Sequence, residues 1–288
     1  MGVSSVGNTA NIQSAIAVAS RRTGIDFNYL LGQAQVESGM RSDAHAGTSS
    51  ATGLYQFIDQ SWLGVVKAHG TEHGMGWAAD SIKQTSSGRY VVSDPATRRA
   101  ILALRSDPTA ASLMAAEHAS DNKDALESSL NRPATGTDLY MAHFLGLGGA
   151  RSFLSAMDAN PGRSGASMFP AAARANRNIF YAANGQPRSL ADIYSHFSDR
   201  LDQGAQAVGA TGSASGVPEG FAAARAQWSM PIDGGGEVVL GNGATDGDRE
   251  WINSTLANLN TLREPMNPMR PTPQNARLAY LMLANLGA

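Results

Sequence analysis

Apolar residues recur at spacings of three and four along the first two thirds of the chain, which is typical of amphipathic helices. The segment "NTANIQSAIAVASRRTG" puts Ile12 and Ile16 on one face, begins with capping residues and ends in basic residues and glycine. "DQSWLGVVKAHG" is a shorter piece of the same kind. Asp-Pro pairs at 94–95 and 107–108 predict two further helix starts, since Asp accepts from free N–H groups and Pro tolerates the first turn.

The helix expected over about residues 26 to 38 carries an acid on its apolar stripe. Phe27, Leu30 and Ala34 share one face, and Glu37 falls on the same face. Loss of hydration disfavours the charged form of a carboxyl, so a proton stays available, as a general acid requires. The periodicity alone is also compatible with Glu37 marking the polar rim where the helix ends near Gly39.

Later segments complete a mainly α-helical pattern. "TGTDLYMAHFL" predicts a helix closed by the glycine-rich "GLGGA", and "GRYVVSD" predicts a short strand. "FPAAARANRNIFYAANGQPRSLADIYSHFSDRL" predicts one short helix, a turn at 185–187 and a second helix capped by Ser189. We expect four parts: a helical domain over 8–160, a helical extension docked on it over 161–201, a loop-rich linker with a small hairpin at "GEVVLGNG" over 202–274, and a C-terminal helix over 275–288.

Composition narrows the function classes. The 22 basic and 24 acidic residues nearly balance at a net charge of −2, so no nucleic acid or anionic lipid partner is expected. The absence of cysteine excludes disulfides, thiolate metal sites and cysteine nucleophiles. No apolar run reaches the ~20 residues of a membrane span, so no transmembrane segment is expected. The N-terminal sequence lacks the pattern of a secretory signal.

One histidine pair has metal-ligand spacing. His69 and His73 lie four apart in "KAHGTEHGMG", but the glycines there favour surface-loop histidines over a zinc site. We therefore expect no metal and no cofactor.

A second candidate cluster lies in "TSSATGLYQF". Tyr55 and Gln56 offer a ring and an amide to a sugar, and Gly53 permits close backbone approach. An ordinary turn into a helix, with Leu54 and Phe57 in the core, explains the same residues equally well.

The order of these pieces resembles bacterial soluble lytic transglycosylases, which are related to goose-type lysozyme. That family has an acid-Ser pair at a helix end, then Gly-Leu-Met-Gln, then a distant Ala-Tyr-Asn-Ala-Gly. Here the first pair is 37–38, the second motif is 53–56 with Tyr in place of Met, and the third keeps Tyr140 and Ala142 within "LYMAHFLG". Met141 and His143 depart from the family pattern. The resemblance covers about residues 10–155.

The resemblance implies a lysozyme-like α fold that cuts the β-1,4 bond between N-acetylmuramic acid and N-acetylglucosamine in peptidoglycan. Glu37 would protonate the leaving oxygen and then act as base toward the muramoyl 6-hydroxyl, which closes a 1,6-anhydro ring. It implies substrate-binding or supporting roles for Ser38, Ser50, Tyr55, Gln56, Tyr140 and His143. An interior position is the alternative for His143. Glycan strands would be the partner, in the periplasm or cell envelope.

Several alternatives stay open. A muramidase would make the same cut with water, and Asp43 or Asp59 could then be a second acid, although loop or capping roles also fit them. A non-catalytic peptidoglycan-binding or assembly module of a flagellar or secretion apparatus could keep the site without activity, and the C-terminal tail could hold such a partner. A phage-type lysin, with export outside the usual secretory route, is a further reading.

Overall fold

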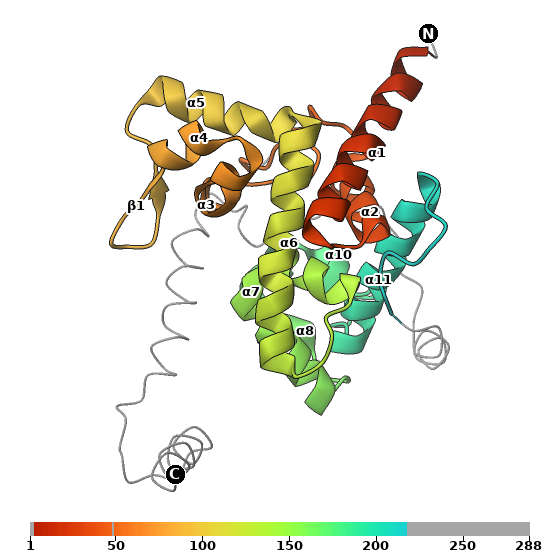
Figure 1. Cartoon of the computed structure of the whole chain (residues 1–288). Coiled ribbons are helices and arrows are strands. Elements are labelled where there is room, and N and C mark those ends of the chain that lie inside the picture. The colour runs from red at the N-terminus through yellow and green to blue at the C-terminus, as the bar shows by residue number, and fades with distance from the viewer. Residues whose placement is uncertain (1–2, 48, 218–288) are drawn as a thin grey trace, which may run out of the picture. The chain divides into compact units, whose positions relative to one another are not determined.

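The computed structural model describes residues 3–47 and 49–217 and is mainly helical, which confirms the predicted mainly α-helical class (Figure 1). The hairpin expected at "GEVVLGNG" and the C-terminal helix expected over 275–288 lie outside the described residues. None of the described helices is long and apolar enough to cross a membrane.

Five helices build the main core. Helix α6 runs through the middle of this assembly, with α1 and α2 on one side and the α3–α5 group on the other (Figure 1). Helix α11 packs against both α2 and α7, and α7 packs against α6. These five helices are α1 (Val3–Thr23), α2 (Phe27–Ser38), α6 (Pro108–Leu130), α7 (Gly136–Ala159) and α11 (Leu190–Ala207).

Local capping explains where several helices begin and end. Asp26 accepts from the backbone N–H of Tyr29 to start α2, and Gly39 ends it in the left-handed conformation. Asp94 and Asp107 accept from N–H groups one turn ahead, so both Asp-Pro pairs start helices as predicted. These are α5 (Pro95–Ala103) and α6.

The segment between α2 and α6 is a smaller layer. It contains α3 (Asp59–His69), η1 (Gly70–His73), α4 (Gly76–Ser81), β1 (Lys83–Gln84), β2 (Tyr90–Val91), α5 and η2 (Leu104–Ser106). The predicted strand is confirmed as β2, which pairs with β1 antiparallel and places Gln84 opposite Tyr90. The hydrogen bond from the Trp62 indole to the Ile101 carbonyl (2.8 Å) joins α3 to α5.

The helix predicted to close at the glycine-rich "GLGGA" does lose its helical backbone at Gly146 (φ 71°), the first residue of that stretch. A second helical part, which was not predicted, follows this kink directly and runs to Ala159, and α7 comprises both parts. The reason is burial, because Phe153 and Leu154 beyond the kink are completely buried and draw the second half of the helix onto the core.

The C-terminal part of the described chain shares this core. The single short helix predicted from Phe169 is two short pieces, α9 (Pro170–Ala175) and α10 (Arg177–Phe180), and a further short helix, α8 (Gly165–Met168), precedes them. Helix α11 starts at the predicted cap, where Ser189 and Asp192 form a reciprocal capping box. It runs past the expected end at residue 201 to Ala207, and the completely buried Phe197 and Leu201 join the common core.

The first residues of the expected linker are also packed. The Asp202 carboxylate accepts from the backbone N–H groups of Ala214 (2.7 Å) and Ser215 (2.9 Å). The Ser215 carbonyl in turn accepts from the Thr137 N–H at the start of α7 (3.0 Å). This contact requires Gly136, because a Cβ there would clash with the Ala214 carbonyl.

Candidate active site

Glu37 lies in the last turn of α2 and its carboxyl points at α7. The hydroxyl of Tyr140 donates to Glu37 Oε1 at 2.7 Å, and His143 Nε2 lies 3.5 Å from the same oxygen. Tyr140 and His143 are three apart on α7, so they share one face of that helix. The Glu37 side chain is only 4% exposed and that of His143 is 8% exposed. The acid is therefore sheltered and has partners from a helix that lies far away in the sequence.

The tyrosine partner stays protonated. Burial raises the pKa of Tyr140 well above its usual value, and the negative charge of Glu37 raises it further. The hydroxyl therefore remains a donor to the carboxyl over the whole neutral range. Burial and then the charge of Glu37 also raise the pKa of Tyr29, which lies on α2 itself. Within the described residues, Tyr140 supplies the one hydrogen bond to the Glu37 carboxyl, which leaves Oε2 without one.

Aromatic rings surround the acid and its partners. The Phe57 ring lies edge-on to His143 (6.4 Å between centroids) and to His118 (6.0 Å). The Tyr140 ring packs against Phe197 of α11 at 5.1 Å. Burial lowers the pKa of His118 to about 4, and the neighbouring His143 acts in the same direction. His118 is therefore neutral near pH 7 and adds no positive charge beside His143.

The Gly53–Gln56 segment forms a compact loop. The Gly53 backbone is left-handed (φ 84°), and the Gln56 amide donates to the carbonyls of Gly53 (2.8 Å) and Ala44 (3.2 Å). The Arg105 guanidinium donates to the carbonyls of Ser50 (2.8 Å) and Phe57 (2.9 Å) from the other side. The loop is therefore held by its own backbone acceptors, and Phe57 at its end is directed toward the histidines.

The remaining predicted substrate residues make their contacts elsewhere. The Ser38 hydroxyl donates to the Ala34 carbonyl (2.9 Å) and accepts from the Arg41 N–H (3.2 Å). Ser50 is exposed and its hydroxyl accepts from the Asp59 N–H. Tyr55 is completely buried. The structure thus brings together Glu37, Tyr140 and His143, while substrate contacts by Ser38, Ser50, Tyr55 and Gln56 stay predictions.

Neither candidate second acid contacts Glu37 among the described residues. Asp43 is exposed. Asp59 lies in the first turn of α3 and forms ion pairs with Arg98 and Arg105 (3.0 Å to Arg105). Both positions fit the loop and capping roles that the sequence also favoured.

His143 lies in the interior, but one of its ring nitrogens lacks a hydrogen bond in the described part of the chain. Its Nε2 is buried and forms no hydrogen bond within the described residues, and it faces the Glu37 carboxyl. A buried polar atom without a partner costs free energy, which a bound ligand offering a hydrogen bond would offset.

Sequence reasoning missed three residues that border this site: Tyr29, His118 and Phe197. Tyr29 lies two turns before Glu37 on the same helix, and that spacing could have indicated it. His118 and Phe197 come from α6 and α11, and nothing local in the sequence connects them to Glu37. No known protein-family model matches this chain.

Proposed function

We propose that this chain is a peptidoglycan lytic transglycosylase with a lysozyme-like catalytic domain, in which Glu37 is the single general acid and base. One observation carries the proposal, the 2.7 Å hydrogen bond from Tyr140 to Glu37 Oε1. It joins residues that the resemblance assigns to the first and third motifs, which lie 103 residues apart in the chain. This pairing of a buried carboxyl with a tyrosine supports the proposal that Glu37 and Tyr140 have the roles that the resemblance implies.

The reaction needs one carboxyl. Protonated Glu37 gives its proton to the glycosidic oxygen as the bond from muramoyl C1 to that oxygen breaks. The muramoyl 6-hydroxyl oxygen then bonds to C1 and its proton returns to the Glu37 carboxylate. A 1,6-anhydro ring forms, no water is consumed and the enzyme is restored. The lack of a second acid at Glu37 among the described residues fits this scheme better than water-dependent cleavage by two carboxylates.

The neighbours of Glu37 have distinct parts in the proposal. Tyr140 fixes the Oε1 edge of the carboxyl, so that Oε2 is the oxygen available to the sugar. His143 Nε2 is positioned to hydrogen-bond a substrate oxygen, because it lies beside the carboxyl without a partner. The substrate would place the enzyme in the periplasm or cell envelope, and a flagellar or secretion component is a candidate partner for the tail.

The test uses the purified full chain on cell-wall sacculi, with mass spectrometry of the released muropeptides. We expect products ending in 1,6-anhydromuramic acid. Glu37→Gln should lower release at least about 10²–10⁴-fold, the usual contribution of a general acid. The Gln carbonyl can still accept from Tyr140, so the variant should keep its thermal stability. Asp43→Asn is the matched control, since this exposed acid should not affect release.

The other outcomes separate the alternatives. Products one water heavier, with reducing ends, would show a muramidase. Retention of the protein on sacculi without any release would show a binding or assembly module. Unchanged release by Glu37→Gln would remove Glu37 as the acid.

A further inference from the structure

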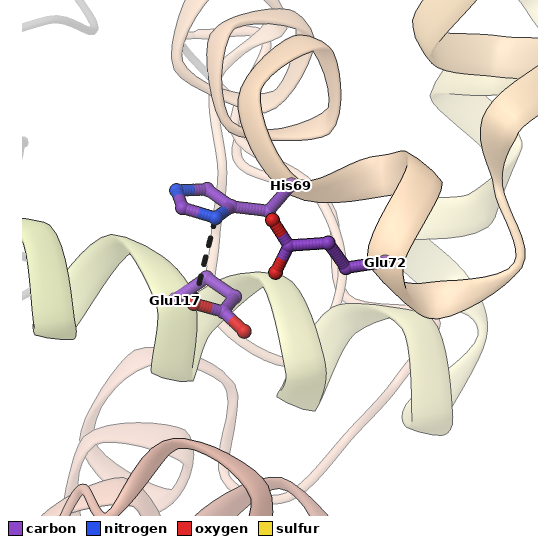
Figure 2. Close-up of side chains that lie close together, drawn as sticks. All are labelled: His69, Glu72 and Glu117. Atoms are coloured by element: carbon purple, nitrogen blue, oxygen red, sulfur yellow. Dashed lines mark ion pairs between the residues drawn. The ribbon is translucent and has the colours of Figure 1, made fainter.

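Three potential metal ligands meet between η1 and α6, away from the Glu37 carboxyl's own partners. His69 ends α3, Glu72 lies in η1 and Glu117 lies near the middle of α6, and their side chains point toward one another (Figure 2). One ligand atom from each lies within 4.8 Å of the others. The sequence presents His69 and His73 as the pair, but the fold selects the two glutamates as the companions of His69.

The distance between His69 and Glu117, the two less exposed ligands (called the inner ligands below), suits a shared ion better than a direct hydrogen bond. His69 Nδ1 lies 3.6 Å from Glu117 Oε2, which is too long for a hydrogen bond. Two ligands about 2.1 Å from a tetrahedral zinc ion lie about 3.4 Å apart. The gap therefore matches the edge of a zinc coordination shell, and the exposed Glu72, with a ligand atom within 4.8 Å of the other two, can supply the third position.

Outer partners hold both inner ligands in orientation. Asp121 Oδ2 lies 2.9 Å from His69 Nε2, and His73 Nε2 lies 2.6 Å from Glu117 Oε1. His69 Nε2 and Glu117 Oε1 are thus used by these neighbours, which leaves His69 Nδ1 and Glu117 Oε2 to bind the ion. Carboxylate-oriented histidines and hydrogen-bonded ligating carboxylates are the usual surroundings of protein-bound metal ions.

The charges of the cluster also favour a cation. Glu72, Glu117 and Asp121 gather three carboxyls, and no lysine or arginine among the described residues forms an ion pair with them. Glu117 and Asp121 form ion pairs with the two histidines, and Glu72 forms none among the described residues. A dipositive ion at the centre would offset this negative charge at short range.

We propose that His69, Glu72 and Glu117 bind a zinc ion, with Asp121 and His73 as orienting partners. An imidazole ligand selects zinc over magnesium and calcium, which prefer oxygen ligands alone. His69 and Glu117 are 18% and 14% exposed, so the ion can enter from the surface and a water can take the fourth position. The bound ion would tie the α3–η1 segment to α6 and is independent of the function proposed for Glu37.

The experiment is calorimetric titration of zinc chloride into the full chain after dialysis against a chelator, with thermal unfolding in parallel. We expect one ion per chain and a higher Tm with zinc. Glu72→Gln should weaken binding at least tenfold and leave the metal-free Tm unchanged, because Glu72 is exposed. His69→Ala should abolish binding. Asp124→Asn, an exposed acid on the same helix α6, should bind zinc as the parent protein does.

Three results would overturn the proposal. Absence of saturable binding would show that the histidines act only as ionic partners of the carboxylates. Equal binding by Glu72→Gln and the parent would remove Glu72 from the ligands and contradict the three-residue site. Magnesium chloride, titrated in the same way, should give no comparable heat, and equal affinity for it would contradict the assignment to zinc.

Discussion

The hydroxyl of Tyr140 replaces hydration that the Glu37 carboxyl loses on burial. Tyr140→Phe removes this donor and keeps the ring that packs on Phe197. We expect release of muropeptides to fall by about 10- to 100-fold, since a hydrogen bond to a charged group is worth about 1.5–3 kcal/mol. The measurement is the rate of release from sacculi, with unfolding followed in urea to confirm an intact fold.

Tyr29→Phe is the control for this variant. Tyr29 is buried near Glu37, and the charge of Glu37 raises the pKa of its hydroxyl. This hydroxyl donates no hydrogen bond to the Glu37 carboxyl. The control should keep close to parental activity. Equal losses in the two variants would show that the activity depends on general packing around α2 and not on the Tyr140 donor.

The residues of the site were only partly predictable. Glu37, Tyr140 and His143 could be selected because motif order and helical spacing are visible in one sequence. The roles of their neighbours could not be predicted, because they depend on contacts with other segments. Examples are the burial of Tyr55 and the hydrogen bond from the Gln56 amide to the Ala44 carbonyl.

At the scale of elements, the loop that carries Phe57 depends on Gly53. Its backbone is left-handed, and a Cβ would clash with the Arg105 carbonyl. We expect Gly53→Ala to lower the free energy of unfolding by about 1–3 kcal/mol from backbone strain, with the clash adding to this. Urea unfolding measures it. Gly47→Ala in the same region meets no atom within 4 Å and should cost far less. Similar losses for both would refute the role of the close approach.

Element boundaries were predictable where their cause is local. The Asp-Pro starts of α5 and α6 and the Ser189 cap of α11 depend on residues within one turn of each boundary. The second helical part of α7 beyond Gly146 was not predictable in this way, because it depends on the burial of residues such as Phe153 in a core built from distant segments.

At the scale of the whole described unit, the expected helical extension has a larger part in the core than its position in the sequence suggests. Helix α11 lies along α2, the helix that carries Glu37, and supplies Phe197 to the ring cluster at Tyr140. The sequence shows that α11 has an apolar face but not which helix covers it. Long-range packing of this kind has no local signature.

The stability of this unit should depend on pH through His196 of α11. The residue is 7% exposed, and burial first, then the charges of Arg200 and Arg188, lower the pKa of its imidazole from 6.5 to about 4. Between these two values the unfolded chain binds a proton that the folded chain does not, so stability falls as the pH drops from about 6.5 to 4. The loss from this one group reaches about 3 kcal/mol over that window, at 1.36 kcal/mol for each pKa unit.

His196→Leu isolates this contribution, because leucine cannot titrate and the carboxyls that also protonate in acid are common to both proteins. The free energy of unfolding in urea, measured at several pH values from 7.5 to 4, should therefore decrease less steeply for the variant than for the parent. Above pH 7 the two curves should run parallel, since the histidine is then neutral in both states. Curves that stay parallel down to pH 4 would mean that the imidazole has the same pKa in the folded and the unfolded protein. His196 would then be accessible to water, and α11 would pack less closely against α2 and α7 than the buried position of His196 requires.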